Sequence, residues 1–180
     1  SSSSSSNMFS SYGASDFNDQ SVIHFGLQSN ANLIHNTFVD NQITSTVIGG
    51  FAAGNIDIKA SIIHERFPYD QTTDTIFITS AVSQNINCLV VSKALAIGNN
   101  IKVADPLFVD VDNKDFHLQD LSPAIDFCEN FFPHHKDMDQ ESHGWNNPNV
   151  PNQGGLTFNT YDAGADEFRD DEEIFQNGFE

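Results

Sequence analysis

The sequence predicts an all-β chain whose short parallel strands stack into a solenoid. Two kinds of β-rich run recur along residues 21–97, and both are rich in the Val, Ile, Phe and Thr residues that favour strands. Asn, Asp, Gly and Gln separate the runs, and no long stretch carries apolar residues at helical spacing. A repeat of roughly 20 to 50 residues is typical of a solenoid, because a single coil cannot bury its own apolar face.

The recurring runs fall into two columns. The first column contains Val22–Phe25, Thr46–Ile48 and Thr75–Ile78. The second column contains Leu33–Val39, Ile56–Ile63 and Ile86–Val91. Taking Thr37, Ser61 and Cys88 as equivalent positions gives steps of 24 and 27 residues, about the length of one coil. The same register predicts a neighbouring apolar column, which holds Phe38, Ile62 and Leu89.

Composition divides the chain into five parts. Residues 1–20 have a Ser-rich start without an initial Met or a signal peptide, and we interpret them as the remnant of an upstream coil in a fragment. Residues 21–97 hold the repeats, and residues 98–128 are predicted to close the last coil, whose edges would otherwise be open. Residues 129–168 form an irregular loop rich in Pro, Gly and Asn, and residues 169–180 form an acidic tail.

Four motifs lie in and after the closing segment. They are Ala104–Asp110 (ADPLFVD), Asp115–Gln119 (DFHLQ), Leu121–Asp126 (LSPAID) and Tyr161–Phe168 (YDAGADEF). Together they resemble the end of secreted bacterial right-handed parallel β-helix proteins of the pectate-lyase-like architecture. The resemblance covers roughly residues 20–180 and is strongest from Asn87 onward. It implies a right-handed parallel β-helix with a C-terminal cap, exported to the cell surface or the medium.

The resemblance also implies roles for individual acidic residues. Four aspartates of the closing motifs are expected to serve turns and cap contacts rather than catalysis: Asp105, Asp126, Asp162 and Asp166. The short final run Ile174–Glu180 looks like the tails of exported bacterial proteins. Either an export or sorting role or a frayed end fits this run.

The net charge restricts the partners. With 25 acidic residues against 7 Lys and Arg, the formal charge is −18, which would repel phosphate backbones and anionic lipid surfaces. We therefore expect no nucleic acid partner. No apolar run approaches the roughly 20 residues that a membrane-spanning helix needs. We expect a monomer whose partner, if it has one, is a polysaccharide or a surface glycan.

The two cysteines, Cys88 and Cys128, lack the spacing of a zinc site. In an oxidising compartment they can pair and tie the last coil to the closing segment. The alternative is that Cys88 is a small buried residue in a strand and Cys128 lies unpaired nearby.

The densest group of potential metal ligands is Asp137, Asp139 and Glu141, close in sequence to three histidines: His134, His135 and His143. Alternating carboxylates suit Ca²⁺, which takes six to eight oxygen ligands. The spacing departs from a calcium loop because the D-x-[DN]-x-[DN]-G pattern fails after Asp139. In the family that the chain resembles, this place commonly reads D-x-D-G-x-x-R-P, and Gln140 stands where that segment has Gly. The sequence therefore predicts no cofactor, with Ca²⁺ as the ion if any metal binds. His24 and His35, inside strands, are expected to face solvent.

Enzymatic activity has only weak candidates. Lyases of similar fold use a basic residue on an outer wall near acidic residues, and here that role would fall to Lys59 or Arg66, near His64, Glu65 and Asp70. An ordinary solvated wall is the alternative. No pair of carboxylates stands out for glycoside hydrolysis. We therefore predict a non-catalytic terminal portion of a secreted or cell-surface β-helix protein. The alternative is part of a polysaccharide-degrading lyase or glycoside hydrolase whose active site lies in upstream coils.

Overall fold

The computed structural model describes residues 7–10, 22–25, 30–41, 47–51, 54–66, 74–79, 83–129, 136–152 and 161–169. Every regular element in these ranges is a β-strand, which confirms the all-β class. No helix long and apolar enough to cross a membrane occurs in these ranges. The predictions for Ser1–Ser6, for His134 and His135 and for the final run Ile174–Glu180 lie outside the described residues.

The described strands are three to ten residues long. In chain order they are β1 (Asn7–Ser10), β2 (Ile23–Phe25), β3 (Ala31–Ile34), β4 (Asn36–Val39), β5 (Ile48–Phe51), β6 (Asn55–His64), β7 (Ile76–Thr79), β8 (Ser83–Val91), β9 (Asn99–Val103), β10 (Phe108–Asp110) and β11 (Asp115–Leu118).

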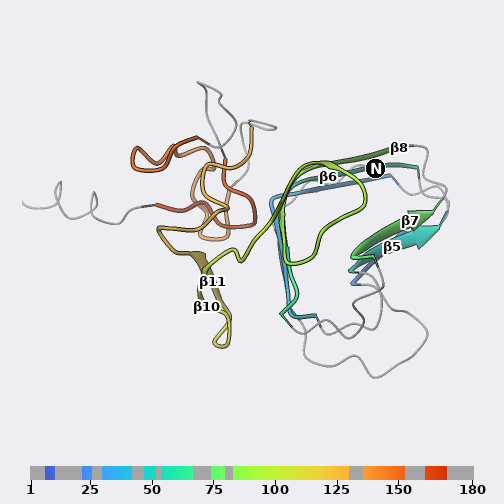
Figure 1. Cartoon of the computed structure of the whole chain (residues 1–180), viewed down its shortest axis with the longest axis horizontal. Coiled ribbons are helices and arrows are strands. Elements are labelled where there is room, and N and C mark those ends of the chain that lie inside the picture. The colour runs from blue at the N-terminus through green and yellow to red at the C-terminus, as the bar shows by residue number, and fades with distance from the viewer. Residues whose placement is uncertain are drawn as a thin grey trace, which may run out of the picture.

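Two parallel sheets form the larger part of the structure. The first has the order β1-β4-β6-β8-β9, with β3 also paired to β6, and the second has the order β2-β5-β7. The chain passes from one sheet to the other after almost every strand (Figure 1). Phe38, Ile63 and Val91 lie in one row of the first sheet, so successive strands repeat at steps of 25 and 28 residues. Only β10 and β11 pair antiparallel among the described strands.

The strands of the first sheet turn a corner at equivalent positions. His35, Ala60, Cys88 and Asn100 have positive φ angles of 53°, 45°, 59° and 52°, and the flanking pairs place them in one row. None of them is glycine, although this left-handed region is unfavourable for side chains with a Cβ. Figure 1 shows β6 and β8 running side by side and turning at the same end. The repeated turn sends the second half of each strand in a new direction.

The inner core fills the space between the two parallel sheets. Phe38, Ile63 and Val91 are at most 1% exposed and stack in adjacent strands. They pack in one cluster with Ile48 and Ile76 of the second sheet. Stacking like residues in consecutive strands gives each strand an apolar neighbour, so the burial continues from strand to strand.

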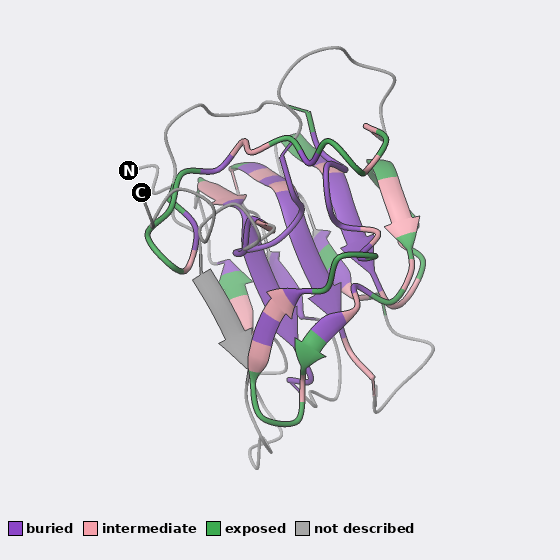
Figure 2. Cartoon of the chain, turned by 90° about the vertical axis from the view of Figure 1, so that its left-hand side faces the viewer, coloured by how far each residue is buried: buried purple, intermediate pink, exposed green. Residues whose placement is uncertain are grey.

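The outer face of β4, β6 and β8 is also buried. Residues 104–129, 136–152 and 161–169, which we name the C-terminal cover, pack against it. Ile62 and Val90 of this face share a second cluster with Ile125, Phe127 and Tyr161 of the cover. Figure 2 shows the buried parts of these strands behind the cover. The strands are therefore buried on both faces after the corner.

The predicted register is wrong by one residue. Thr37 pairs with Ile62 and Ile62 with Val90, whereas Ser61 pairs with Leu89 and Cys88 lies in the corner row. Neither predicted trio, Thr37–Ser61–Cys88 or Phe38–Ile62–Leu89, forms a row. The steps are 25 and 28 residues instead of 24 and 27. Because both faces are buried here, the apolar run does not alternate with polar residues, and the sequence carries no signal for the register.

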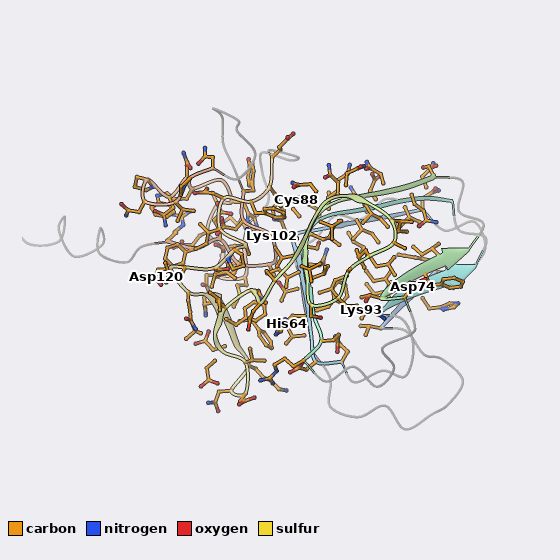
Figure 3. The ribbon with its side chains drawn as sticks, in the orientation of Figure 1. His64, Asp74, Cys88, Lys93, Lys102 and Asp120 are labelled. Carbon is orange, nitrogen blue, oxygen red and sulfur yellow. A yellow bond between two sulfur atoms is a disulfide. The ribbon has the colours of Figure 1, made fainter. Side chains whose placement is uncertain are left out.

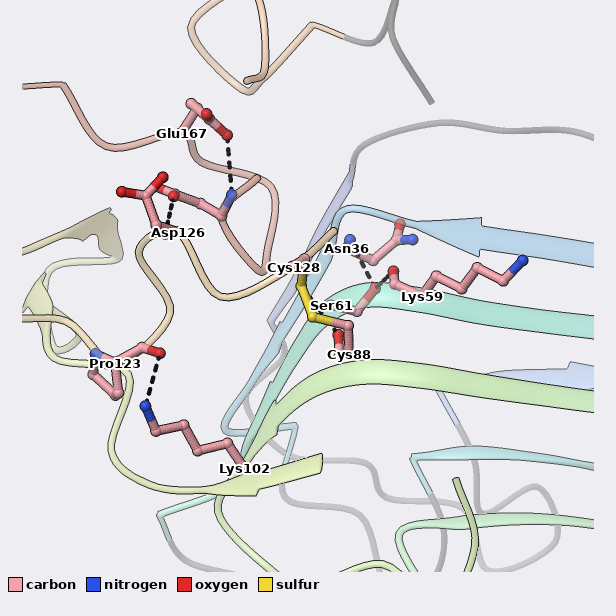
Figure 4. Close-up of a disulfide and its surroundings, with 10 residues drawn as sticks. Asn36, Lys59, Ser61, Cys88, Lys102, Pro123, Asp126, Cys128 and Glu167 are labelled. Carbon is pink, nitrogen blue, oxygen red and sulfur yellow. Dashed lines mark hydrogen bonds between the residues drawn. A yellow bond between two sulfur atoms is a disulfide. The ribbon is translucent and has the colours of Figure 1, made fainter. Parts of the chain in front are cut away.

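A disulfide joins the first sheet to the cover. Cys88 in the corner row is bonded to Cys128, with their Cα atoms 5.6 Å apart (Figures 3 and 4). Cys128 in turn exchanges two backbone hydrogen bonds with Tyr161, at 2.8 and 2.7 Å. On the neighbouring strand β9, the Lys102 ammonium donates to the Pro123 carbonyl at 3.4 Å. Covalent and polar contacts thus hold the cover on the strands.

Gly164 marks the closest approach of the cover to the sheet. Its N–H donates to the Ala60 carbonyl at 3.0 Å, and its φ is +107°. A Cβ at this position would lie 2.8 Å from Ile62 Cδ1 and 2.9 Å from Thr37 Oγ1. The Gly164→Ala variant should therefore lose about 1–3 kcal/mol, measured by urea unfolding, through overpacking and backbone strain.

A matched double variant separates the two causes. Ile62→Val removes the Cδ1 atom that the new methyl group would meet, so Gly164→Ala should cost less in the Ile62→Val background than in the wild type. The strain from the positive φ should remain. Equal costs in the two backgrounds would contradict the close packing of Gly164 on Ile62.

Candidate functional site

A cavity of about 400 Å³ opens where β11 meets the other two segments of the cover. Its charged lining consists of Asp115, His117, Asp139, Glu141, Asp166, Glu167 and Arg169. Strand alternation places Asp115 and His117 on the same side of β11, while Phe116 and Leu118 point into the core. The remaining charged residues come from residues 136–142 and 161–169, so three separate parts of the chain build the cavity.

His117 is held between two carboxylates. Its Nδ1 lies 2.5 Å from Asp115 Oδ1 and its Nε2 lies 2.9 Å from Asp139 Oδ2. An ionised carboxylate only accepts hydrogen bonds, so both contacts favour the protonated imidazolium, in which both ring nitrogens donate. Burial lowers the pKa of His117, but hydrogen bonds to Asp115 and Asp139 and the charge of Asp166 outweigh it and raise the pKa to about 9.

Asp166 forms the buried wall of the cavity. Its side chain accepts the Leu118 N–H at 2.9 Å through Oδ2, and the residue is 6% exposed. Burial raises the pKa of Asp166 to about 6, although the Leu118 hydrogen bond and the charge of His117 act against this. Asp137 and Asp139 add to the increase by repulsion. The carboxylate therefore lies in a position where a positive partner would stabilise it.

His117, Asp139 and Asp166 bring three potential ligand atoms together. One nitrogen and two carboxylate oxygens lie within 4.8 Å of one another. An imidazole nitrogen and carboxylate oxygens are ligands of Zn²⁺ and related divalent ions. The three side chains can thus bind a metal cation. Without a metal, the protonated ring of His117 supplies the positive charge between the carboxylates.

The predicted calcium ligands divide into two kinds. Asp139 and Glu141 line the cavity, and Glu141 also pairs with Arg169 at 2.6 Å. Asp137 is buried, and its Oδ1 accepts the N–H groups of Asp139 at 3.0 Å and Glu141 at 2.7 Å. It therefore shapes the turn that presents the other two. The structure groups Asp139 with His117 and Asp166 as potential metal ligands.

Three of the histidines considered from the sequence are buried: His35, His64 and His143. The prediction that His35 faces solvent is wrong, because its ring is covered and stacks on His143 with the centroids 4.0 Å apart. The His143 Nδ1 lies 3.1 Å from Glu167 Oε2. The cover hides this part of the outer wall, which the sequence of the strand alone does not indicate. His24 is exposed, as predicted.

The two basic residues considered for catalysis pair with acidic neighbours. The Lys59 ammonium lies 3.0 Å from Asp57 Oδ1. Arg66 contacts Asp40 Oδ2 through Nε and Nη2, both at 2.6 Å, and Asp112 Oδ1 through Nη2 at 2.9 Å. Neither Lys59 nor Arg66 lines the cavity. Lys59 and Asp57 pair within β6, whereas Arg66 links the end of β6 to Asp40 after β4 and to Asp112 in the turn between β10 and β11.

The acidic residues of the closing motifs accept backbone N–H groups. Asp105 accepts from Leu107 at 2.9 Å, and Asp126 accepts from Asn147 at 3.0 Å. Asp162 accepts from Asp126 and Phe168, both at 2.7 Å. Burial raises the pKa of Asp162 well above the usual range, and the Glu167 carboxylate raises it further. These contacts hold the turns of the cover together.

The chain matches no protein-family model. Searches of the curated proteins and of the solved structures also gave no match. The arguments about function therefore depend on the residues and their geometry.

Sequence reasoning missed His117, Asp115 and Asp166 as a group. The spacing of Asp115 and His117 was a usable signal, since residues two apart in a strand lie on one face. Asp166 follows them by about fifty residues in the sequence, and only the folded cover brings it to their side. No local pattern could have linked it to them.

The buried Asp162 offers a test of the cover. Both of its oxygens accept backbone N–H groups, so the Asp162→Asn variant would set an amide N–H₂ against a donor. We expect a loss of about 1–3 kcal/mol in chemical unfolding, because a buried donor then lacks its acceptor. Asp120→Asn, at the exposed edge of the cover (Figure 3), is the control and should change little. Similar effects of the two variants would contradict this role for Asp162.

The pKa of His117 predicts a pH dependence of stability. The folded-state value of about 9 lies above the ordinary 6.5, so His117 contributes its full stability below pH 6.5. This contribution is lost as the pH rises through about 9. Thermal unfolding in EDTA between pH 6 and 10 should show a fall in melting temperature that is smaller in His117→Gln. Identical pH profiles for the two proteins would refute the prediction.

Proposed function

We propose that this chain is the non-catalytic end of a secreted or cell-surface right-handed parallel β-helix protein. The observation that carries the proposal is the regular stacking of the parallel strands at steps of 25 and 28 residues, with a corner at the same row in each strand. Coils of similar length that share a corner and an apolar row are the expected form of a β-solenoid.

The C-terminal cover supports the structural role. The apolar outer face of the stacked strands needs protection from water. Here the cover packs Ile125 and Phe127 against the outer face of β4, β6 and β8. The disulfide between Cys88 and Cys128 holds it there, and such bonds persist in oxidising compartments. This combination favours an exported protein.

The wall before the corner has the chemistry of a glycan-contacting surface. Asn85 Nδ2 donates to Asp57 Oδ1 at 2.9 Å, and Ser83 Oγ donates to Asn55 Oδ1 at 2.9 Å. These side chains lie in neighbouring strands and are exposed or partly exposed. Amide, hydroxyl and carboxylate groups in rows can exchange hydrogen bonds with sugar hydroxyls. A neutral polysaccharide is the partner that suits this wall and the charge of −18.

The disulfide provides the test of the structural role. The Cys88→Ala/Cys128→Ala double variant should lose about 2–4 kcal/mol. Ala60 already occupies the same row with a positive φ, so alanine fits the corner. By hydrogen exchange, residues 104–129 and the strands β4, β6 and β8 should exchange faster, while β5 and β7 serve as the internal reference. Faster exchange near residue 128 alone would refute the stabilising role.

Glycan assays distinguish binding from catalysis. The full chain should cleave no member of a panel of acidic and neutral polysaccharides, judged by ultraviolet absorbance of lyase products and by reducing ends. Binding to an immobilised neutral glycan should weaken in Asn85→Ala and persist in Asp120→Ala. Turnover that disappears in Lys59→Ala or Arg66→Ala would overturn the non-catalytic proposal in favour of a polysaccharide-degrading enzyme.

A further inference from the structure

We propose that His117, Asp139 and Asp166 form a binding site for a divalent transition-metal ion, with Zn²⁺ as the representative ion. The site would take one imidazole nitrogen and one oxygen from each carboxylate. These three atoms already lie within 4.8 Å of one another at the wall of a cavity of about 400 Å³. The inference is independent of the proposed structural function.

The distances require only a small adjustment. Zn²⁺ lies about 2.0–2.2 Å from nitrogen and oxygen ligands, which places tetrahedral ligand atoms roughly 3.3 Å apart. The Nε2 of His117 and Oδ2 of Asp139 are 2.9 Å apart. The side chain of Asp139 is 53% exposed and can move, whereas Asp166 is buried and provides a fixed ligand. A rotation of Asp139 can therefore complete the site.

A second layer of contacts orients the ligands. The Nδ1 of His117 contacts Asp115 Oδ1 at 2.5 Å, so Nε2 is the nitrogen that faces the cavity. Metal-bound histidines commonly donate their other ring N–H to a carboxylate in this way. Asp166 Oδ2 accepts the Leu118 N–H at 2.9 Å, and Asp137 holds the backbone of Asp139 at 3.0 Å. Each of the three ligands is thus positioned by a neighbour outside the triad.

The ligand set favours Zn²⁺ or a related ion over the Ca²⁺ expected from the sequence. Calcium prefers six to eight oxygen ligands, whereas imidazole suits Zn²⁺ and other transition metals. Three protein ligands leave a fourth position open toward the cavity, as in metal sites that hold a water molecule or a substrate. The ligands come from β11, residues 136–142 and residues 161–169, so the ion would also join three parts of the cover.

Calorimetric titration of the full chain with Zn²⁺ after EDTA treatment tests the site. We expect the wild type to bind one Zn²⁺ per chain. His117→Gln and Asp139→Asn should abolish this binding or weaken it at least tenfold. Asp115→Asn leaves all three ligands in place and should weaken binding by about 10–100-fold, as changes in the outer shell do. Asp139 is exposed, so its variant keeps the test valid if a substitution at His117 or Asp166 prevents folding.

Two control variants separate this site from other imidazoles and acids on the surface. His24→Gln changes an exposed histidine of β2, and Asp120→Asn changes an exposed acid of the cover. Both should bind Zn²⁺ like the wild type. Absence of Zn²⁺ binding, or unchanged binding in Asp139→Asn, would overturn the proposal. Tighter binding of Ca²⁺ than of Zn²⁺ would overturn the choice of metal.

Discussion

The contact between the C-terminal cover and the outer face of β4, β6 and β8 is the constraint on which the rest of the structure depends. Ile62 and Val90 on this face are almost completely buried, although they point away from the space between the two parallel sheets. Without the cover, this apolar row would face water, at a cost of roughly 25 cal/mol for each Å² exposed. The disulfide at the corner row and the close approach of Gly164 to Ile62 both serve this contact.

The cover has little regular structure of its own, and buried acidic side chains take the place of strand pairing. Asp126, Asp162 and Glu167 are each at most 3% exposed. They accept hydrogen bonds from backbone N–H groups in turns, where strand pairing does not supply an acceptor. A buried carboxylate is costly unless it is hydrogen-bonded. Here each buried carboxylate is hydrogen-bonded, and these hydrogen bonds connect residues 126, 144–147 and 161–168. The acidic composition thus has a structural use inside the protein as well as an effect on solubility.

The cavity beside β11 forms where three segments of the cover meet. His117 lies there between Asp115 and Asp139 and next to the buried Asp166, and Arg169 adds a second basic side chain. In the proposed metal site, a divalent ion would bind Asp139 and Asp166 together with His117. Lys59 and Arg66, by contrast, pair with acidic residues away from the cavity. The potential metal ligands that the described chain groups together therefore lie in the cover.

The sequence by itself determined the all-β class, the approximate repeat length and the positions of most strands, because residue type and the spacing of turns act locally. It did not determine the register, since Thr37, Ile62 and Val90 lie in runs that are buried on both faces and carry no alternation. It also left open whether Cys88 pairs with Cys128. Only the tertiary structure decided that pairing, the burial of His35 and the meeting of His117 with Asp166, because each depends on where the cover packs.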